Sequence, residues 1–474
     1  RIRQLVKTYC DFMPVAIKFD NETINQQRAL WKESPQNLTK DDYLEFYRYL
    51  YPFEEDPLLW IHLNTDYPFV LNGILFFPKL KPDVEVSRGQ IKLFCNQVFV
   101  SDNCEEVVPE FLMPLRGAID STDIPLNVSR SALTANRTVR RIADYIAKKI
   151  GDRLKSLSAD DPKEYIRCWQ DVGTYVKYGS LKDEKFKKQV EDLIIYRTTA
   201  TTAAPAPAPE EPTSAGDDAW AEGDRDDSGL TLTENGDAYT TLQAYLDRNQ
   251  TRHENRVFYC SDPSTQGTYV RLYEGQGLEV LYLDSFIDAN YFVPFLEKEH
   301  SNLQFVRVDA ELDKNLLEEE QKTEIIDPQT NKTRSESIKE LFERALNNPK
   351  INVRAEALKG DDQSDTPPAM VLLPEAMRRL KEMIALSQQQ DIGFPEEHTL
   401  LVNTAHPLVQ NLLTMSQGAI VQASGEASPA AQLAEQLCLH IYDLALVAQK
   451  GFGADDLKSF IQRSNQVLTN LTQK

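Results

Sequence analysis

Hydrophobic and polar positions recur with two different periods along the chain, and the changes between them predict its elements. Thr39 and Asp42 stand at capping-box spacing before an apolar stripe, which predicts a helix with one buried face. Runs rich in aromatic and branched residues, 68–78 and 91–100, predict strands. Apolar residues at helical spacing predict three further helices, over 129–157, 162–178 and 183–196.

The segment 198–229 breaks this pattern. Alternating alanine and proline stiffen it, its acidic residues repel one another, and it offers almost nothing apolar to bury. We therefore interpret it as a disordered surface insertion. Beyond it, apolar runs predict three buried strands with helices between them near 264–275 and 286–299, as in βαβ units with a parallel or mixed sheet. The three strand-like runs are 256–262, 277–284 and 302–309.

The last third is predicted to be helical from residue 311 onward, with two strand-like runs, 351–358 and 369–374, that we expect to pair. Two amphipathic helices, over 429–450 and 455–471, end the chain. They cannot bury both of their stripes against each other alone, so they pack either on the preceding domain or on a second copy. A symmetric four-helix bundle favours the dimer. Its expected interface is Leu437, Ile441, Leu444, Phe460, Ile461 and Leu468.

Composition narrows the class of protein. A chain of 474 residues predicts several domains, and its formal charge of −21 disfavours a general nucleic-acid binder, which needs a basic face. No apolar run approaches the roughly 20 residues that span a bilayer. The six cysteines show no CxxC pair, which is typical of reduced, intracellular thiols and predicts no metal site. The chain starts at Arg1 in mid-helix periodicity and is interpreted as the downstream part of a longer protein.

Motifs of catalysis are mostly missing from the sequence. There is no P-loop and no nucleophile elbow, and the pair Gly275 and Gly277 lacks the third glycine of a dinucleotide fingerprint. Asp284 is the last residue of a predicted strand, a position where an α/β enzyme places functional acids. A lone acid at this position is more often a helix cap, and Ser285 and Asp288 fit that alternative. The residues of this chain alone do not indicate a complete enzyme.

The predicted helix that starts near residue 129 does not explain why Arg130 is present. Arg130 follows Ser129, a predicted helix cap, and so stands at the positive end of a helix dipole, where a cation is unfavourable. Arg130 either forms an ion pair with acidic residues elsewhere on the surface or binds the phosphate of a ligand that another domain holds. A guanidinium at a loop tip neutralises charge on a transferred phosphoryl group.

The stretch 98–133, VFVSDNCEEVVPEFLMPLRGAIDSTDIPLNVSRSAL, closely resembles the middle-domain signature of the ninety-kilodalton heat-shock chaperone family, called HtpG in bacteria. The segment 29–50, with its Leu-Trp pair and capped helix, and the segment 400–412 resemble the family as well. The resemblance covers most of the chain except 198–235 and is weakest in the C-terminal third.

The resemblance implies an α/β (α+β) multidomain fold. A middle domain would consist of two α/β/α layered units joined by helices, followed by a mixed α+β C-terminal domain that ends in a helical dimerisation bundle. The implied divisions are a large middle unit, an acidic Ala/Pro-rich insertion, a small α/β/α unit and a C-terminal dimerisation domain: 1–197, 198–235, 236–312 and 313–474. The family's N-terminal ATP-binding domain would be missing.

By this resemblance Arg130 is the arginine that reaches the ATP γ-phosphate when the chaperone clamp closes, and Asn127 belongs to the same loop. ATP and Mg²⁺ would serve the full-length protein, and no cofactor is expected for this chain alone, which would not be an enzyme by itself. The family commonly has glutamine four residues after the arginine, whereas this chain has Thr134. Its C-terminus lacks the acidic EEVD tail, so co-chaperone binding through that tail is not expected.

The family binds clients on apolar surfaces, and the segment 374–386 is the natural match. It sets Met377, Leu380, Met383 and Ile384 on one face, and adaptable methionines suit a surface for many partners. The alternative is that this stripe is buried in the dimer. Tyr291 and Phe292, in the last helix of the middle domain, form a weaker candidate patch.

These features together predict a cytoplasmic, homodimeric chaperone fragment that binds partly unfolded clients and, with its missing domain, supports ATP-driven clamp closure and protein folding under stress. Two alternatives stay open from the sequence. One is a dimeric scaffold that does not bind clients, and the other is an α/β enzyme with a ligand site near Asp284.

Overall fold

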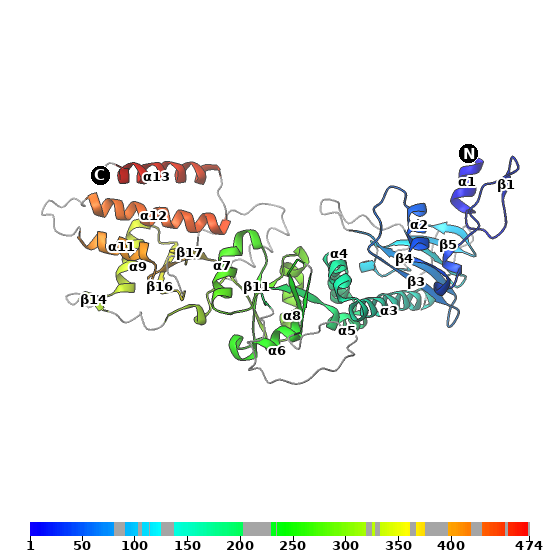
Figure 1. Cartoon of the computed structure of the whole chain (residues 1–474), viewed down its shortest axis with the longest axis horizontal. Helices are drawn as coiled ribbons and strands as arrows, with labels where there is room; N and C mark the ends of the chain where they lie inside the picture. The colour runs from blue at the N-terminus through cyan, green and yellow to red at the C-terminus, as the bar shows by residue number, and fades with distance from the viewer. Residues whose placement is uncertain are drawn as a thin grey trace, which may run out of the picture. The chain divides into compact units, whose positions relative to one another are not determined.

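The computed structural model describes residues 1–79, 91–102, 107–112, 114–124, 137–201, 229–233, 235–318, 325–327, 332–360, 366–374, 397–418, 429–450 and 454–472. They form two compact units, which are residues 1–195 with 231–236, and residues 196–230 with 237–474 (Figure 1). Both units combine helices with sheets, so the predicted α+β multidomain class is confirmed.

The first unit is built on a five-stranded sheet in the order β3-β4-β7-β5-β6. β5 and β7 are parallel, and the other neighbouring strands are antiparallel. The strands are β3 Leu59–Thr65, β4 Leu71–Phe77, β5 Ile91–Cys95, β6 Val98–Ser101 and β7 Arg116–Asp120. A short helix, α1 Ile2–Tyr9, and a small ladder, β1 Lys18–Phe19 with β2 Glu22–Thr23, precede the sheet.

One face of this sheet is covered by α2 Lys40–Leu50 and the short 3₁₀ turn η1 Leu30–Lys32. The predicted capping box is confirmed, because Thr39 and Asp42 each bond the other's backbone N–H. The apolar stripe of α2 is buried in an aromatic core, so the predicted helix with one buried face is confirmed. That core includes Trp31, Tyr43, Phe46, Tyr47, Leu50, Phe76 and Phe94.

The other face carries the helices of residues 137–190. They are α3 Arg137–Asp160, α4 Pro162–Lys182 and α5 Glu184–Val190, so the helices predicted over 162–178 and 183–196 are confirmed with shifted ends. The ring of Tyr175 on α4 lies 6.3 Å from that of Phe77 on β4. The expected helix start at Ser129 lies outside the described residues.

The prediction of one strand over 91–100 is wrong. Asn96 and Gln97 have φ angles of +50° and +62°, so the run folds into the hairpin β5–β6 around a two-residue turn. Left-handed conformations at both turn positions match the twist of the flanking strands.

Most of a six-stranded sheet, in the order β13-β11-β12-β8-β10-β9, lies in the second unit. Its strands are β8 Ile195–Thr198, β9 Leu230–Leu232, β10 Ala238–Thr241, β11 Arg256–Cys260, β12 Leu281–Tyr282 and β13 Gln304–Arg307. β11 is parallel to both β12 and β13, so the predicted mixed sheet is confirmed. Its helices are α6 Leu242–His253, α7 Pro263–Gly275 and α8 Val293–Glu299, the last preceded by a π-helical turn over Asp288–Phe292.

A three-stranded sheet follows, with β16 Ile351–Glu356, β17 Ala369–Leu372 and β18 His398–Asn403. The prediction that β16 and β17 pair is wrong, because β18 lies between them. β18 is parallel to β16 and antiparallel to β17, so the backbone of β18 is paired on both sides. A central strand of this kind has apolar side chains toward both faces, as β18 does.

Helices cover one face of the three-stranded sheet. They are α9 Arg334–Leu346, α11 Pro407–Gly418 and α12 Pro429–Lys450, and α13 Ala454–Thr472 lies beside α12 (Figure 1). The two terminal helices are therefore confirmed. The helix predicted from residue 311 is wrong over 311–318, where a 3₁₀ turn, Lys314–Leu316, precedes a bridge from Leu317 to Leu358. Leu316 and Leu317 are both buried, and the bridge from Leu317 to Leu358 uses backbone groups that a helix would pair internally. A small ladder, β14 Ile325–Asp327 with β15 Lys332–Thr333, leads into α9.

The other face of the three-stranded sheet shares a core with the six-stranded sheet. Met370, Leu372 and Leu401 pack with residues of β11 and α7 in one buried cluster. Tyr269 on α7 donates a hydrogen bond to the Val371 carbonyl over 2.6 Å. The expected boundary between residues 312 and 313 thus falls inside one continuous core.

Candidate functional sites

The exit of β7, which leads toward Arg130, is fixed by a buried carboxylate. Asp120 is 1% exposed, and its Oδ2 accepts from Trp31 Nε1 at 3.1 Å and from the Gln97 backbone N–H at 3.2 Å. Lys32 Nζ lies 3.4 Å from the same oxygen and balances its charge. Three donors from two segments, the 3₁₀ turn η1 and the β5–β6 turn, therefore hold the end of β7 in one place.

The next residues are bound to the start of β4. Ser121 Oγ donates to the Val70 carbonyl over 2.6 Å, and Asp123 Oδ2 accepts from the Val70 N–H over 2.6 Å. Beyond the loop, Tyr145 of α3 donates to the Asn64 carbonyl over 3.3 Å. Residues on both sides of the segment 125–136 are thus anchored on the same sheet. Arg130 and Asn127 themselves, like Thr134, lie outside the described residues.

The aromatic patch expected at Tyr291 and Phe292 is divided by the structure. Phe292 is buried at 1% exposure, whereas Tyr291 is 49% exposed. Tyr291 forms an edge-on ring pair with Phe286, which is 64% exposed and which the sequence did not single out. The exposed patch is therefore Phe286 with Tyr291. The predicted stripe of Met377, Leu380, Met383 and Ile384 lies outside the described residues.

The predicted dimer residues fall into two groups on α12 and α13. Ile441 is buried in the core of its own chain, and Leu437 and Phe460 are half-buried. Leu444, Ile461 and Leu468 are exposed by 44%, 49% and 59%. The two helices are held together by a stacked pair, His440 on Phe460, and by an ion pair between Asp443 and Arg463. Burial lowers the pKa of His440.

Asp284 does not line a described cavity. Its carboxylate accepts from Arg197 Nη2 at 3.3 Å, and the Arg197 guanidinium stacks 3.8 Å from the centre of the Tyr282 ring. Its side chain is 48% exposed, as expected of a surface ion pair. The helix-capping role belongs to Ser285, whose Oγ accepts from the Asp288 N–H.

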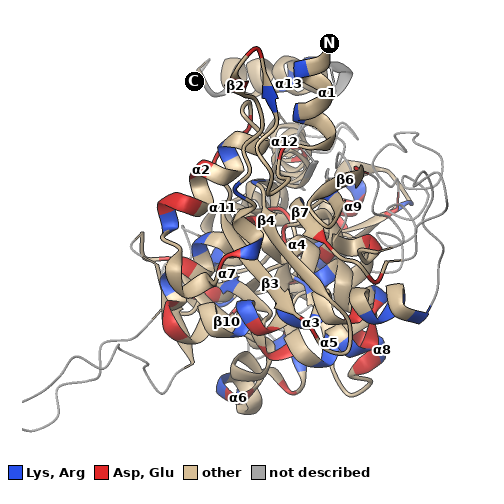
Figure 2. Cartoon of the chain, turned by 90° about the vertical axis from the view of Figure 1, so that its right-hand side faces the viewer, with Lys and Arg blue, Asp and Glu red and all other residues tan. Residues whose placement is uncertain are grey.

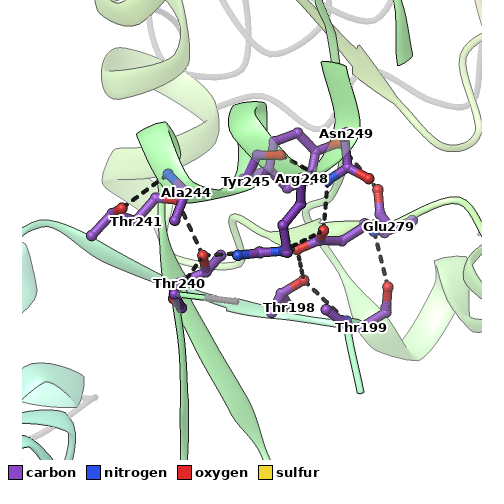
Figure 3. Close-up of polar contacts among 12 residues, drawn as sticks. Thr198, Thr199, Thr240, Thr241, Ala244, Tyr245, Arg248, Asn249 and Glu279 are labelled. Carbon is purple, nitrogen blue, oxygen red and sulfur yellow. Dashed lines mark hydrogen bonds and ion pairs between the residues drawn. The ribbon is translucent and has the colours of Figure 1, made fainter. Parts of the chain in front are cut away.

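A buried polar cluster in the second unit joins α6 to the sheet (Figure 3). Glu279, 8% exposed, receives hydrogen bonds from Arg248 Nη2 at 2.7 Å, Asn249 Nδ2 at 2.5 Å and Thr198 Oγ1 at 2.7 Å. Both carboxylate oxygens have donors. The cluster therefore stabilises the packing of α6 on the sheet. No single motif in the sequence predicts it.

Charges of both signs are interspersed on the exposed helices of the first unit, such as α3 and α5 (Figure 2). Lys185 of α5, for example, lies 2.8 Å from Asp144 of α3. None of the helices described by the structure combines the length and apolarity needed to cross a bilayer. Five cysteines in the described part of the chain are free thiols.

Comparison with known proteins places these features in a family. The model of the Hsp90 protein family matches residues 3–206 and 230–473. The chain is 33% identical over 441 residues to the chaperone protein HtpG of Bacteroides thetaiotaomicron, covering 88% of this chain and 59% of that protein. It is 33% identical over 438 residues to HtpG of Porphyromonas gingivalis, covering 87% and 58%. HtpG of Myxococcus xanthus is 26% identical over 496 residues, covering 99% and 67%.

The chain thus spans less than two thirds of the length of the first two relatives. The family model matches on both sides of the acidic segment and leaves 207–229 unmatched. The match includes the strand β7, the anchored residues Ser121 and Asp123 that follow it, and the terminal helices. On this ground the chain belongs to the Hsp90 family.

Proposed function

We propose that this chain is the client-binding and dimerising part of an ATP-dependent chaperone. The observation that carries the proposal is the family match over nearly the whole chain, which includes the anchored residues Asp120 and Ser121 before Arg130. Three functions are assigned to three regions: the arginine loop, the exposed aromatic patch and the terminal helices.

The arginine loop would act on a nucleotide held elsewhere. Arg130, with Asn127 in the same loop, would reach the γ-phosphate of ATP bound with Mg²⁺ to the N-terminal domain of the full-length protein. A guanidinium stabilises the charge that develops on a transferred phosphoryl group. The anchors at Asp120 and Asp123 support this role, because an arginine acts on a reacting group only if its loop is positioned. Alone, the chain would not turn over ATP.

Client binding would use exposed apolar surface. Phe286 and Tyr291 are exposed together, and aromatic rings contribute large contact areas to binding. The stripe of Met377, Leu380, Met383 and Ile384 is proposed to extend this surface. Dimerisation would cover the exposed leucines and isoleucine of α12 and α13. In a cell this protein would act in the cytoplasm.

Light scattering from a heat-aggregating test protein tests client binding. The intact chain, without nucleotide, should suppress aggregation at near-stoichiometric amounts. Changing Phe286 and Tyr291 to Ser should weaken suppression, and changing Met377 and Met383 to Ser should weaken it further. The matched control changes Phe53 and Tyr67 to Ser, two aromatic residues that are 97% and 89% exposed in the first unit.

A well-folded dimer that leaves aggregation unchanged at several-fold excess would contradict the proposal. It would favour the second candidate, a dimeric scaffold without client binding, for which the exposed faces of α12 and α13 are the specific observation.

A further inference from the structure

The strand β13 ends the six-stranded sheet, and its free side lines a cavity of about 370 Å³. Three consecutive residues of the strand, Gln304, Phe305 and Val306, border the cavity. Successive side chains of a strand point to opposite faces, so a cavity that touches three in a row lies along the edge of the strand. Among the described strands only β11 pairs with β13, which makes this the open edge.

The backbone of β13 presents hydrogen-bonding groups to this cavity. Gln304 N donates to the Asn255 carbonyl and Val308 N to the Tyr259 carbonyl, each over 3.0 Å. In a parallel ladder, alternate residues bond one neighbour and those between them face the other way. The N–H and C=O of Phe305 are therefore turned from β11 toward the cavity.

The opposite wall comes from the three-stranded sheet. Leu372 and Thr399 are partners in the β17–β18 register, and Arg354 is added from β16. With Val306, which packs against the same buried cluster, Leu372 at 1% exposure gives the cavity an apolar floor. The Arg354 side chain is 34% exposed at its rim.

Among the hydrogen bonds of the described residues, Arg354 uses only two of its donors. Its Nε and Nη2 both donate to one oxygen of Glu356, at 3.1 and 2.8 Å. A guanidinium carries five N–H donors in all. A carboxylate next to this rim would therefore meet a charge that Glu356 only partly engages.

We propose that the open edge of β13 binds an extended polypeptide segment as an added strand. One apolar side chain of the segment fills the cavity, and an acidic side chain pairs with Arg354. The inference rests on the proposed function, since it names the class of client segment: extended, apolar at alternate positions and carrying an acid. A polypeptide is the ligand whose backbone matches an unpaired strand edge, and apolar pockets beside such an edge select side chains.

The test uses a fluorescein-labelled peptide of alternating Val and Thr with one Glu, and the intact chain. Fluorescence anisotropy should report binding. The same peptide with alternate backbone amides N-methylated keeps its side chains but cannot donate to Phe305 or continue the ladder. Its affinity should be at least about tenfold lower, as expected when backbone hydrogen bonds carry the recognition.

Two variants locate the site. Thr399→Phe fills the cavity and should weaken binding by roughly fivefold or more, the effect of about 1 kcal/mol, whereas Thr414→Phe, at an exposed position of α11, should not. Arg354→Ala should weaken the Glu peptide but not a Gln version. Arg344→Ala is the control, because it also removes an exposed arginine paired with a glutamate. Urea unfolding midpoints verify that the variants fold.

Equal affinity for the methylated and unmethylated peptides would overturn the proposal, and so would no binding at about 1 mM, the weak limit of specific recognition. Tighter binding after replacement of 375–396 by a Gly/Ser linker would also overturn it, because the chain's own segment would then occupy the edge. If the chain suppresses aggregation but binds the methylated and unmethylated peptides equally well, the proposed chaperone function stands and the strand-edge site does not.

Discussion

At the residue scale, the second unit depends on a few buried polar groups. Glu279 is a charge in a poorly solvated place, and Arg248 neutralises it through Nε and Nη2 at 3.3 and 2.7 Å. A buried carboxylate that loses its cation keeps its desolvation cost without the compensating attraction. This pair therefore helps to hold α6 on the sheet.

Arg248→Ala should therefore lower the free energy of unfolding of the second unit by roughly 3 kcal/mol. The double change Arg248→Ala with Glu279→Gln should recover part of the loss, because the uncompensated charge is gone. Urea unfolding of both variants measures this. If the double variant is no more stable than Arg248→Ala, packing of the Arg248 stem dominates.

His253 makes the stability of this unit depend on pH. Burial, above all, lowers its pKa to about 4, against the weaker opposing effects of Glu279 and Asp313. The unfolded chain binds a proton near pH 6.5 that the folded chain does not, so stability decreases as pH falls from about 6.5 to about 4. The loss attributable to His253 at the lower limit is roughly 3 kcal/mol.

Unfolding midpoints of the chain and of His253→Gln, recorded between these pH values, test this dependence. The variant should be less stable at neutral pH, because Tyr245 loses its partner Nδ1 at 2.9 Å, but should lose less stability on acidification. Parallel pH profiles would contradict the assignment to His253.

At the element scale, the turn of the β5–β6 hairpin shows why a sequence pattern finds some elements and not others. A two-residue turn with positive φ at both positions is normally signalled by glycine. Here it is built from Asn96 and Gln97, so the run 91–100 looks like a single strand. The backbone N–H of Gln97 donates to Asp120, which stabilises the unusual conformation.

Gln97→Gly should raise the free energy of unfolding of the first unit by about 0.5 kcal/mol, because glycine adopts this φ without strain. The hydrogen bond to Asp120 needs only the backbone and persists. Asn96→Gly is the control and should change stability less, since asparagine tolerates the left-handed region. A lower thermal midpoint for Gln97→Gly would show that the Gln97 side chain contributes more than the strain costs.

In this chain, local sequence patterns predict the helices well but do not predict which strands pair with one another. The cap at Thr39 and the apolar stripes of α12 and α13 depend on residues that lie close together in the sequence. The order β16-β18-β17 depends on a strand that begins 26 residues after β17 ends, His398 after Leu372. The arginine motif is likewise local, whereas Trp31 and Asp120, 89 positions apart, meet only in the folded sheet.

At the scale of the whole molecule, the terminal helices carry more apolar surface than one chain buries. Leu444, Ile461 and Leu468 are each at least 44% exposed. Burial of three such side chains on each of two chains stabilises association by several kcal/mol, at about 25 cal/mol per Å² of apolar surface. Self-association through this face is therefore the expected state of the intact chain.

Changing these three residues to Ser should convert the dimer to a monomer with little loss of helix content. Sedimentation velocity across a concentration series measures the shift. Leu408→Ser, at a 37% exposed leucine on α11, is the control. A triple variant that sediments like the unaltered chain would place the interface elsewhere.

The core shared by α7, β11 and the three-stranded sheet determines where this chain can be cut. Tyr269 bonds Val371, and Gln449 near the end of α12 donates to Asp309 over 2.7 Å, so residues on both sides of position 312 complete one another. A protein ending at 312 would expose Leu272 and Phe258, and one starting at 313 would expose Met370 and Leu401. Each piece made separately would expose apolar core and fold poorly. The smallest fragment worth expressing from this half runs from residue 195, so that it keeps β8 between β12 and β10, to the last helix.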